Sequence, residues 1–406
     1  MDSLLTNEAS LPRLLYLGDV PVERGLHGSA LLYRLLEVYP KNKLLIVEGS
    51  RKSNLTLQLS GVQYHGYKQV WSRLLQTRFH SYASSAATLC APMRGRPVPD
   101  FVLSFRPQAV FTVVWGYVWA AAAAYAERAN LPLHLVVHDD WLNVEARLAL
   151  ERRLIDQRLR YWYPKAASRL CVSPYMAEAY CRRYGAAADV LYPSCAADVP
   201  IAAEPPVTLR GACDPFTVAF AGTIHLDYPQ ALSRMATALR CIGGRLIVYG
   251  PEPHVSARSM LEQSNIEMRG KVSSPELIRQ CRTEAHAMFV PMSFEEQDRS
   301  NMETSFPSKL ADSTAVGIPV VIHGPEYCSA VRWAFENPGV AEVVTEATVN
   351  ALVMALARLR DPTRRLQLAG QAIFRCKQYF AHARAVSLIY SQLSESISRR
   401  RLPAGP

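Results

Sequence analysis

The chain has 406 residues, of which 49% are hydrophobic and 20% are charged, so it is neither a disordered nor a fibrous protein. This length allows two ordinary domains, each with its own core. The 45 lysines and arginines exceed the 35 aspartates and glutamates, and the net charge of +10 suits an anionic partner: a nucleotide, a phosphorylated lipid headgroup, a membrane surface or a nucleic acid. The nine cysteines include no C-x-x-C pair, which argues against a disulfide framework or a zinc site.

Short apolar runs alternate with helical patterns through the first half of the chain. The expected strands are 13–18, 43–48, 109–114, 133–139 and 169–173, and the expected helices are 28–39, 119–129 and 142–163. Such alternation predicts a parallel sheet with helices on both faces.

The second half repeats this alternation. Strands are expected at 216–222, 245–250, 287–291 and 319–324, and helices at 229–242, 256–264, 275–281, 307–316 and 349–360. A proline-rich linker is expected at 196–214, a helical pattern with a break near Phe380 covers 362–396, and the tail from Ser398 is expected to be disordered or surface-bound.

We therefore expect an α/β protein of two Rossmann-like doubly wound domains facing a cleft. The domains are 1–200 and 201–380; a helix over 381–396 can pack back on the first domain, and 397–406 is a basic tail.

Residues 109–126 carry no charge and are long enough to span a membrane. Their first half is β-branched and their second half is alanine-rich, with Gly116 between, which favours a buried strand followed by a helix. The N-terminal residues lack a cationic segment before an apolar stretch, so we expect no signal peptide and a cytoplasmic protein.

The residues 305–321 read SFPSKLADSTAVGIPVV. Pro307 suits the first turn of a helix, where Ser308 and Lys309 would lie beside free backbone N–H groups that can bind a diphosphate. Asp312, one turn later, could reach a ribose hydroxyl. The alternative is an ordinary amphipathic helix that leads into a strand.

This stretch resembles the signature S-F-P-S-K-L-x-E-Y-x-A-x-G-x-P-V-V of family-4 retaining glycosyltransferases, which have the GT-B fold. Two further fragments, FTVAFAG before Thr223 and IEMRGKV at 266–272, resemble the same family in order and spacing. The resemblance implies that the domain 1–200 binds an acceptor and the domain 201–380 binds a nucleotide sugar. It also implies that the Gly222–Thr223 loop approaches the donor phosphates, and that backbone near Gly270 and Val272 holds the base.

The sequence departs from the family pattern at charged positions. Where many relatives carry an Arg and a Lys after the first glycine, this chain has Thr223 and Tyr228, so Lys309 or Lys271 must supply the positive charge. Of the family's two glutamates, eight positions apart, the second aligns with Asp312 and the first with Thr304.

Beside Thr304, Glu303 is expected to be the catalytic carboxylate that faces the sugar. Glu295 and Glu296 are alternatives, as is a solvated loop role for Glu303.

Two segments of the first half are candidates for the acceptor side. The residues Gly25, His27 and Gly28 resemble the family's glycine-rich acceptor loop, although a flexible turn without a ligand has the same composition. His138 and Asp139 follow an expected strand and could hydrogen-bond the transferring sugar or the acceptor; the alternative is a helix N-cap at Asp139 or Asp140.

The resemblance implies a hexosyltransferase-type enzyme that moves a sugar from a nucleotide sugar, of UDP or GDP type, to an acceptor hydroxyl. Retention, no metal, no cofactor and no nucleic-acid partner are expected. The basic surplus favours a glycan or lipid-linked acceptor in cell-envelope or exopolysaccharide synthesis, with contact at the inner face of the membrane. The alternatives are a nucleotide-sugar epimerase, a sugar phosphorylase, a non-catalytic nucleotide-binding module and an inactive relative.

Overall fold

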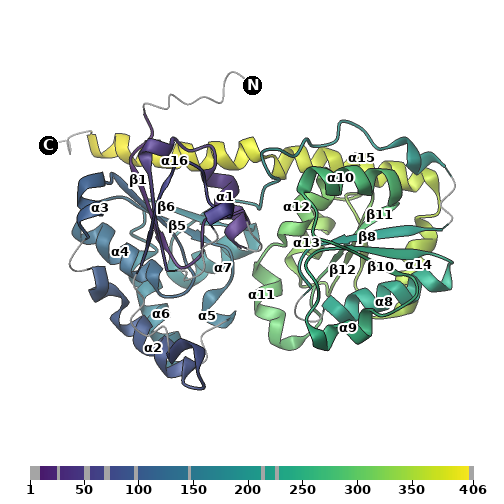
Figure 1. Cartoon of the computed structure of the whole chain (residues 1–406), viewed down its shortest axis with the longest axis horizontal. Coiled ribbons are helices and arrows are strands. Elements are labelled where there is room, and N and C mark those ends of the chain that lie inside the picture. The colour runs from purple at the N-terminus through teal and green to yellow at the C-terminus, as the bar shows by residue number, and fades with distance from the viewer. Residues whose placement is uncertain are drawn as a thin grey trace. The chain divides into compact units, whose positions relative to one another are not determined.

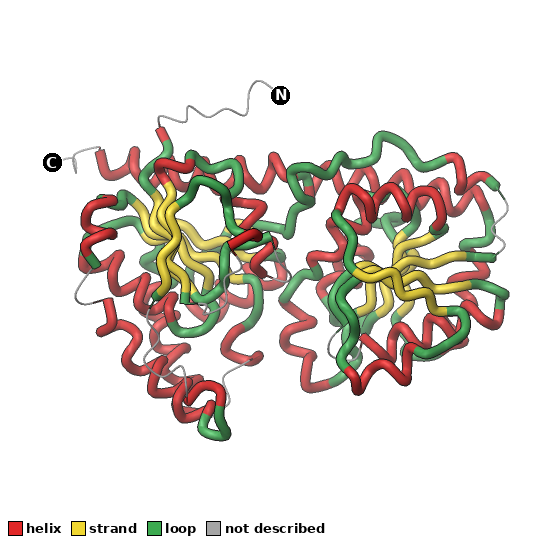
Figure 2. Tube along the Cα trace, in the orientation of Figure 1, coloured by secondary structure: helices red, strands yellow, loops and turns green. Residues whose placement is uncertain are grey.

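The computed structural model describes residues 10–24, 28–49, 55–67, 74–95, 99–144, 148–211, 215–224 and 228–401. It divides into two compact units, of which the first comprises Met1–Tyr192 and Ala383–Pro406 and the second Pro193–His382. In each unit, helices cover both faces of a central sheet (Figure 2).

The first unit contains a seven-stranded sheet in which all neighbouring strands are parallel. In sheet order, the strands are β3 (Gln63–Gly66), β2 (Leu44–Glu48), β1 (Leu14–Gly18), β4 (Ala109–Val113), β5 (Leu133–Val137), β6 (Ser168–Cys171) and β7 (Asp189–Val190). The helices are α1 (Gly28–Leu36), α2 (His80–Cys90), α3 (Asp100–Phe105), α4 (Val118–Arg128), α5 (Trp141–Val144), α6 (Ala149–Trp162), α7 (Pro174–Tyr184) and α16 (His382–Arg401) (Figure 1).

The central strands β1, β2, β4 and β5 are buried along their whole length, which explains why they read as continuous apolar runs. The uncharged stretch 109–126 forms β4, a turn at Gly116 and the buried alanine-rich helix α4. Within the described residues, every helix is too short or too polar to cross a membrane.

Helix α16 lies in the first unit although most of the second unit precedes it in the sequence. The ring of Tyr390 meets that of Tyr39 edge-on at 5.5 Å between centroids, and Ser396 Oγ lies 3.2 Å from Nε2 of the buried His134. The helix continues to Arg401, so the tail expected to be disordered from Ser398 is helical as far as the structure describes it. The helix continues beyond Ser398 because its apolar face packs on the first unit.

The second unit contains a six-stranded parallel sheet with the equivalent topology. In sheet order, its strands are β10 (Ile266–Gly270), β9 (Arg245–Tyr249), β8 (Thr217–Ala221), β11 (Ala287–Pro291), β12 (Val320–His323) and β13 (Glu342–Val344). Its helices are α8 (Tyr228–Cys241), α9 (Val255–Leu261), α10 (Ser274–Glu284), α11 (Arg299–Thr304), α12 (Ser308–Ala315), α13 (Ser329–Glu336), α14 (Val349–Arg358) and α15 (Pro362–Arg375).

The proline-rich segment expected to be a free linker is packed on the second unit. The buried guanidinium of Arg365 donates to the carbonyl oxygens of Leu209 and Gly211, at 2.9 Å from Nη2 in each case. The peptide N–H of Ala202 donates to the Ala315 carbonyl, at the end of α12. Because a buried charge needs this full set of acceptors, the segment is fixed to the domain despite its lack of periodicity.

The expected single helix 142–163 is interrupted. Helix α5 ends at Val144 and α6 begins at Ala149, so the apolar periodicity continues across two helices.

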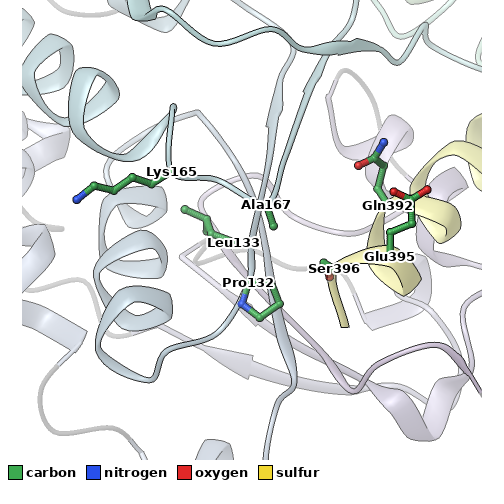
Figure 3. Close-up of a pocket in the computed structure, with 7 residues that line it drawn as sticks. All are labelled: Pro132, Leu133, Lys165, Ala167, Gln392, Glu395 and Ser396. Carbon is green, nitrogen blue, oxygen red and sulfur yellow. The ribbon is translucent and has the colours of Figure 1, made fainter. Parts of the chain in front are cut away.

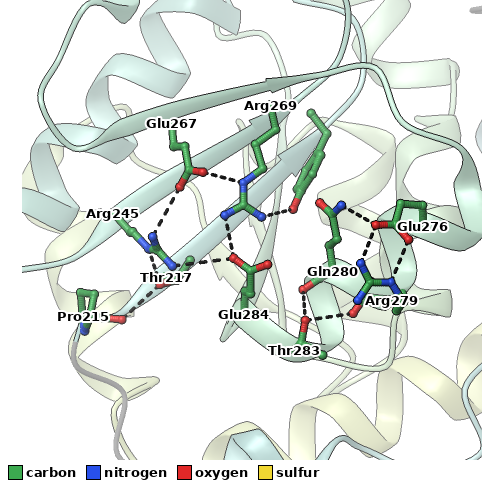
Figure 4. Close-up of polar contacts among 11 residues, drawn as sticks. Pro215, Thr217, Arg245, Glu267, Arg269, Glu276, Arg279, Gln280, Thr283 and Glu284 are labelled. Carbon is green, nitrogen blue, oxygen red and sulfur yellow. Dashed lines mark hydrogen bonds and ion pairs between the residues drawn. The ribbon is translucent and has the colours of Figure 1, made fainter.

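A network of ion pairs holds β10 against the rest of the sheet and α10 (Figure 4). The guanidinium of Arg269 donates to Glu267 at 2.7 Å, to the Tyr249 hydroxyl at 2.9 Å and to Glu284 at 2.6 Å. Arg245 Nη1 lies 3.4 Å from the other Glu267 oxygen. Hydrogen bonding to Arg269 is the main reason that the pKa of Glu284 lies below its usual range. This network fixes the direction in which the chain leaves β10 at Gly270.

Candidate functional site

In both sheets the strand order reverses direction beside one central strand. These switch points lie between β1 and β4 in the first sheet and between β8 and β11 in the second. In open parallel sheets, ligands bind outside the carboxyl ends of the strands at such points. The residues that follow β1 and β8 lie at these switch points, and those that follow β5 and β10 lie at the same carboxyl edge of each sheet. These residues can therefore form a site.

Three glycines bring the ends of β8, β9 and β10 close together. The Gly222 N–H donates to the Tyr249 carbonyl at 2.8 Å, and the Gly250 N–H donates to the Gly270 carbonyl at 2.9 Å. A Cβ on Gly250 would lie only 2.2 Å from the Gly222 oxygen, and Gly222 itself has φ +142°. Only glycine fits this close backbone approach, which brings the three strand ends together.

Lys309 of α12 crosses directly over Gly222. A Cβ on Gly222 would lie 2.4 Å from the Lys309 Cε, and the Lys309 ammonium lies 4.0 Å from the centroid of the Tyr228 ring and 5.5 Å from that of Phe220. Within the described part of the chain, this ammonium makes neither a hydrogen bond nor an ion pair. Burial lowers the pKa of Lys309 to about 7.

Helix α12 begins one residue later than expected, at Ser308, and Pro307 is its N-cap with φ −70° and ψ 116°. The side chain of Pro307 cannot accept a hydrogen bond, so no side-chain cap competes with a ligand for the first-turn N–H groups. Ser308 is exposed there, and Asp312 lies one turn further along the same helix.

The other predicted donor-binding residues follow strands β8 and β10. Thr223 is half-buried next to Gly222, Lys271 is exposed and Val272 is half-buried. Gly270 adopts φ +69°, which turns the chain at the end of β10. The structure therefore brings Gly222 and Lys309 into contact and places Gly270 at a neighbouring strand end.

Glu303, the expected sugar-facing carboxylate, lies on α11 and pairs with Arg299 at 2.9 Å. The same guanidinium lies 3.5 Å from Glu296 and stacks 4.7 Å over the Tyr327 ring. Glu295 and Glu296 are exposed. Glu303 and Glu296 therefore both pair with Arg299, and the catalytic role expected for Glu303 stays a prediction.

In the first unit, His138 and Asp139 follow β5. His138 Nε2 lies 3.2 Å from the Asp139 carboxylate, and the imidazole stacks on Trp115 at 5.5 Å between centroids. A Cβ on Gly28 would lie 3.0 Å from the His138 ring, so the start of α1 packs directly on it. Gly25 and His27, the other predicted residues of this loop, lie outside the described residues.

Trp115 also packs on Trp141 at 4.4 Å. Two buried nitrogens of this cluster, His138 Nδ1 and Trp141 Nε1, have no hydrogen-bond partner within the described part of the chain. A ligand with hydroxyl groups, which can both donate and accept, would satisfy both nitrogens.

Asp140 has a structural role. Its carboxylate is fully buried and binds the Arg183 guanidinium through two hydrogen bonds, each 2.9 Å long. The Trp141 N–H, at the start of α5, donates to the Asp139 carbonyl at 2.8 Å. The two adjacent aspartates are therefore in different surroundings, which their sequence does not reveal.

Asp19 was not predicted as a site residue from the sequence. This carboxylate follows β1 at the switch point and accepts the peptide N–H groups of Tyr117 and Val118 at 2.7 Å each, at the start of α4. Burial raises the pKa of Asp19 to about 6, although the two N–H groups oppose the shift. Gly116, with φ +63°, makes room for it, since a Cβ there would lie 2.1 Å from the carboxylate. The position directly after the first strand was the available signal.

A cavity of about 270 Å³ lies elsewhere, between α16 and the amino ends of β5 and β6 (Figure 3). It is lined by Pro132, Leu133, Lys165, Ala167, Gln392, Glu395 and Ser396. It lies at the edge of the sheet opposite to the residues described above, and it contains none of the predicted site residues.

Comparisons with known proteins agree with the sequence resemblance. Residues 64–194 match the model of the family described as Glycosyltransferase Family 4. No curated protein matches the chain in a sequence search.

Several solved structures share the fold. HepE from Anabaena, solved with UDP and glucose, is 13% identical with a TM-score of 0.64, and the match covers 94% of this chain and 99% of that one. The lipopolysaccharide outer core galactosyltransferase WaaB is 14% identical with a TM-score of 0.59, covering 95% and 99%. Sucrose-phosphate synthase from Thermosynechococcus elongatus is 15% identical with a TM-score of 0.63, covering 95% and 99%. The α/β architecture expected from the sequence, two parallel-sheet domains of GT-B type, is confirmed.

Proposed function

We propose that this chain, which has the GT-B fold and resembles Glycosyltransferase Family 4 over residues 64–194, is a glycosyltransferase that transfers a sugar from a nucleoside diphosphate sugar to an acceptor hydroxyl with retention of configuration. The observation that carries the donor assignment is the contact between Lys309 and Gly222. It combines a desolvated ammonium without an anionic partner among the described residues, a glycine turn and a helix N-terminus at one strand end, which is the chemistry that a diphosphate requires.

The leaving diphosphate gains negative charge as the glycosidic bond breaks, and catalysis requires groups that stabilise this charge. We assign this role to the Lys309 ammonium and the first-turn N–H groups of α12, with Ser308 as a further donor. These groups need no metal ion to neutralise the diphosphate. Asp312 and the backbone at Gly270 and Val272 are the proposed contacts of the nucleoside.

UDP is the proposed donor nucleotide. HepE, which shares the fold, was solved with UDP-glucose as well as with UDP and glucose. Lys309 binds the diphosphate irrespective of the base, so the base preference depends on the chain after β10.

The acceptor is proposed to bind at the cluster of His138, Trp115 and Trp141. Aromatic faces with a few convergent polar groups are typical of small-molecule sites, and the two unpartnered nitrogens can form hydrogen bonds with hydroxyl groups. His138, oriented by Asp139, can accept the proton of the attacking hydroxyl. A glycan or lipid-linked glycan at the inner face of the membrane is the proposed acceptor.

Thermal shift and calorimetry with UDP, GDP, ADP and CMP test the donor assignment. We expect UDP to raise the melting temperature most, because a ligand that binds only the folded state stabilises it by mass action. No shift with any nucleoside diphosphate would remove the proposal.

Release of UDP from a UDP-sugar that depends on an added glycan distinguishes transfer from its alternatives. An epimerase would convert the donor without an acceptor, and a binding module would release nothing.

A further inference from the structure

Helix α2 of the first unit presents a row of large apolar side chains to solvent. Phe79, Tyr82, Leu89 and Met93 are 47%, 69%, 53% and 65% exposed. With Ala86 between them, they repeat at intervals of three and four residues, which places them on one face of α2 and of the helical turn that continues it to Gly95. We call these four residues the α2 surface.

The opposite face of α2 is already used for packing. Ala83, Ala87 and Thr88 are buried, and the helix packs on α6, where the buried Glu151 accepts a hydrogen bond from Ser84. Figure 1 shows α2 beside α6 at the periphery of the unit. The apolar row is therefore additional to what the fold needs, since a scattered exposed leucine would require no explanation but an ordered row does.

The chain around this helix is strongly basic. Residues 49–99 contain seven lysines and arginines and no aspartate or glutamate. The α2 helix itself carries no charged residue.

Arginines lie at both ends of the α2 surface. At one end, the exposed Arg78 lies with its guanidinium 5.0 Å over the Phe79 ring. At the other end, Arg158 donates to the Leu89 carbonyl at 3.0 Å and Arg128 donates to the Pro92 carbonyl at 3.1 Å. The apolar row thus has arginines near both of its ends.

We propose that the α2 surface docks the protein on an anionic lipid bilayer, with Phe79, Tyr82, Leu89 and Met93 inserted at the level of the headgroups and the flanking arginines bound to lipid phosphates. Helices that lie in a membrane interface combine such an apolar face with basic flanks. Aromatic side chains favour the headgroup region, and arginine can extend its charge to a phosphate while its stem stays among apolar groups.

A bilayer fits these features better than a protein partner does. Residues 49–99 contain lysines and arginines but no acidic residue, and each lysine or arginine near an anionic membrane adds to the attraction. A protein interface of ordinary size needs a broader complementary area than one short helix face. The proposal does not depend on the proposed sugar transfer, because donor binding is measured separately on the same variants.

Vesicle flotation tests the proposal with the full chain. Vesicles of phosphatidylcholine alone are compared with vesicles that contain roughly 30% phosphatidylglycerol. We expect the wild-type protein to bind the anionic vesicles at least about tenfold more strongly, and high salt to weaken this binding.

The double variant Tyr82→Ser/Leu89→Ser removes the two central apolar side chains. Because both are exposed, we expect an unchanged melting temperature and unchanged UDP affinity, with vesicle binding reduced at least about tenfold. The matched control Val255→Ser/Met354→Ser removes two comparably exposed apolar residues from the second unit and should bind vesicles like the wild type. Arg78→Gln should weaken binding about fivefold.

Three results would overturn the proposal. They are equal binding of the wild type to neutral and anionic vesicles, wild-type binding by the double variant, and a wild-type dimer in solution that the double variant loses. The third would assign the α2 surface to contact between two copies of the chain.

Discussion

Lys309 provides the sharpest test of the donor site, through the substitution Lys309→Met. Methionine keeps most of the aliphatic stem that packs over Gly222 and Tyr228 but removes the ammonium. A hydrogen bond between charged groups contributes about 1.5–3 kcal/mol, so we expect the variant to bind UDP about 10- to 100-fold more weakly at pH 7.

The pH dependence separates this explanation from a loss of packing. With a pKa of about 7 in the free protein, half of the Lys309 side chains are charged at pH 7 and about 1% at pH 9. The diphosphate keeps its full charge over this range. If binding requires the ammonium, the wild-type affinity should fall about 50-fold between pH 7 and pH 9, and that of Lys309→Met should stay nearly constant.

Isothermal titration calorimetry with UDP at both pH values measures both effects. Lys271→Met is the matched control, since Lys271 is the other lysine that could supply the charge and is fully accessible beside Gly270. It should change the affinity less than about threefold and keep the wild-type pH dependence. The reasoning is refuted if Lys309→Met titrates like the wild type or if Lys271→Met removes the pH dependence.

The same substitution changes stability in a predictable direction. Because the folded-state pKa of Lys309 lies below that of the unfolded chain, folding releases a proton between about pH 7 and pH 10, and wild-type stability rises with pH over that window. Lys309→Met should therefore be more stable than the wild type at pH 7, by up to about 4 kcal/mol, with the gain falling below about 1 kcal/mol near pH 10. Urea denaturation at the two pH values checks the sign.

Three further predictions concern other residues and the metal requirement. Gly222→Ala should weaken UDP binding at least about tenfold, because its Cβ would displace the Lys309 side chain at a backbone φ of +142°. Gly243→Ala, which also has a positive φ, of +70°, but open space around it, should lose only about 1 kcal/mol of stability and keep its affinity, both by calorimetry and denaturation. Asp19→Asn should stabilise the protein at pH 7.5 and have little effect at pH 4, because the raised pKa makes the charged form unfavourable above about pH 6; denaturation curves that show no such difference would contradict the assigned burial. Sugar transfer should be unaffected by EDTA, and a turnover that EDTA removes and Mg²⁺ restores would refute the metal-free mechanism.

Much of the fold could be predicted because buried parallel strands are continuous apolar runs. This signal is present in β1, β2, β4 and β5 of the first unit and in β8 of the second. β3 was missed since its residues are only partly buried, and the two-residue strand β7 is too short for a pattern. Helix α2 was missed for another reason, as its large apolar residues point outward and its buried face is made of small ones.

The candidate site could be predicted only in part, because a motif identifies residues but not their contacts. The resemblance singled out Gly222 and Lys309 separately, and the packing of one on the other depends on how α12 crosses β8. Asp19 escaped notice since its burial depends on Gly116 and the start of α4, which are remote in the sequence. Likewise, nothing in the sequence distinguishes Asp139 from Asp140, which differ only through the distant Arg183.

The placement of α16 has a consequence for how the protein is made. Every residue of the second unit is synthesised before this helix, so the second unit can complete its fold while the first still lacks one of its layers. Until α16 arrives, His134 and Tyr39 lie on an uncovered surface that a chaperone could recognise. A chain truncated before residue 383 should therefore have a protease-resistant second unit and a first unit that is still open to cleavage.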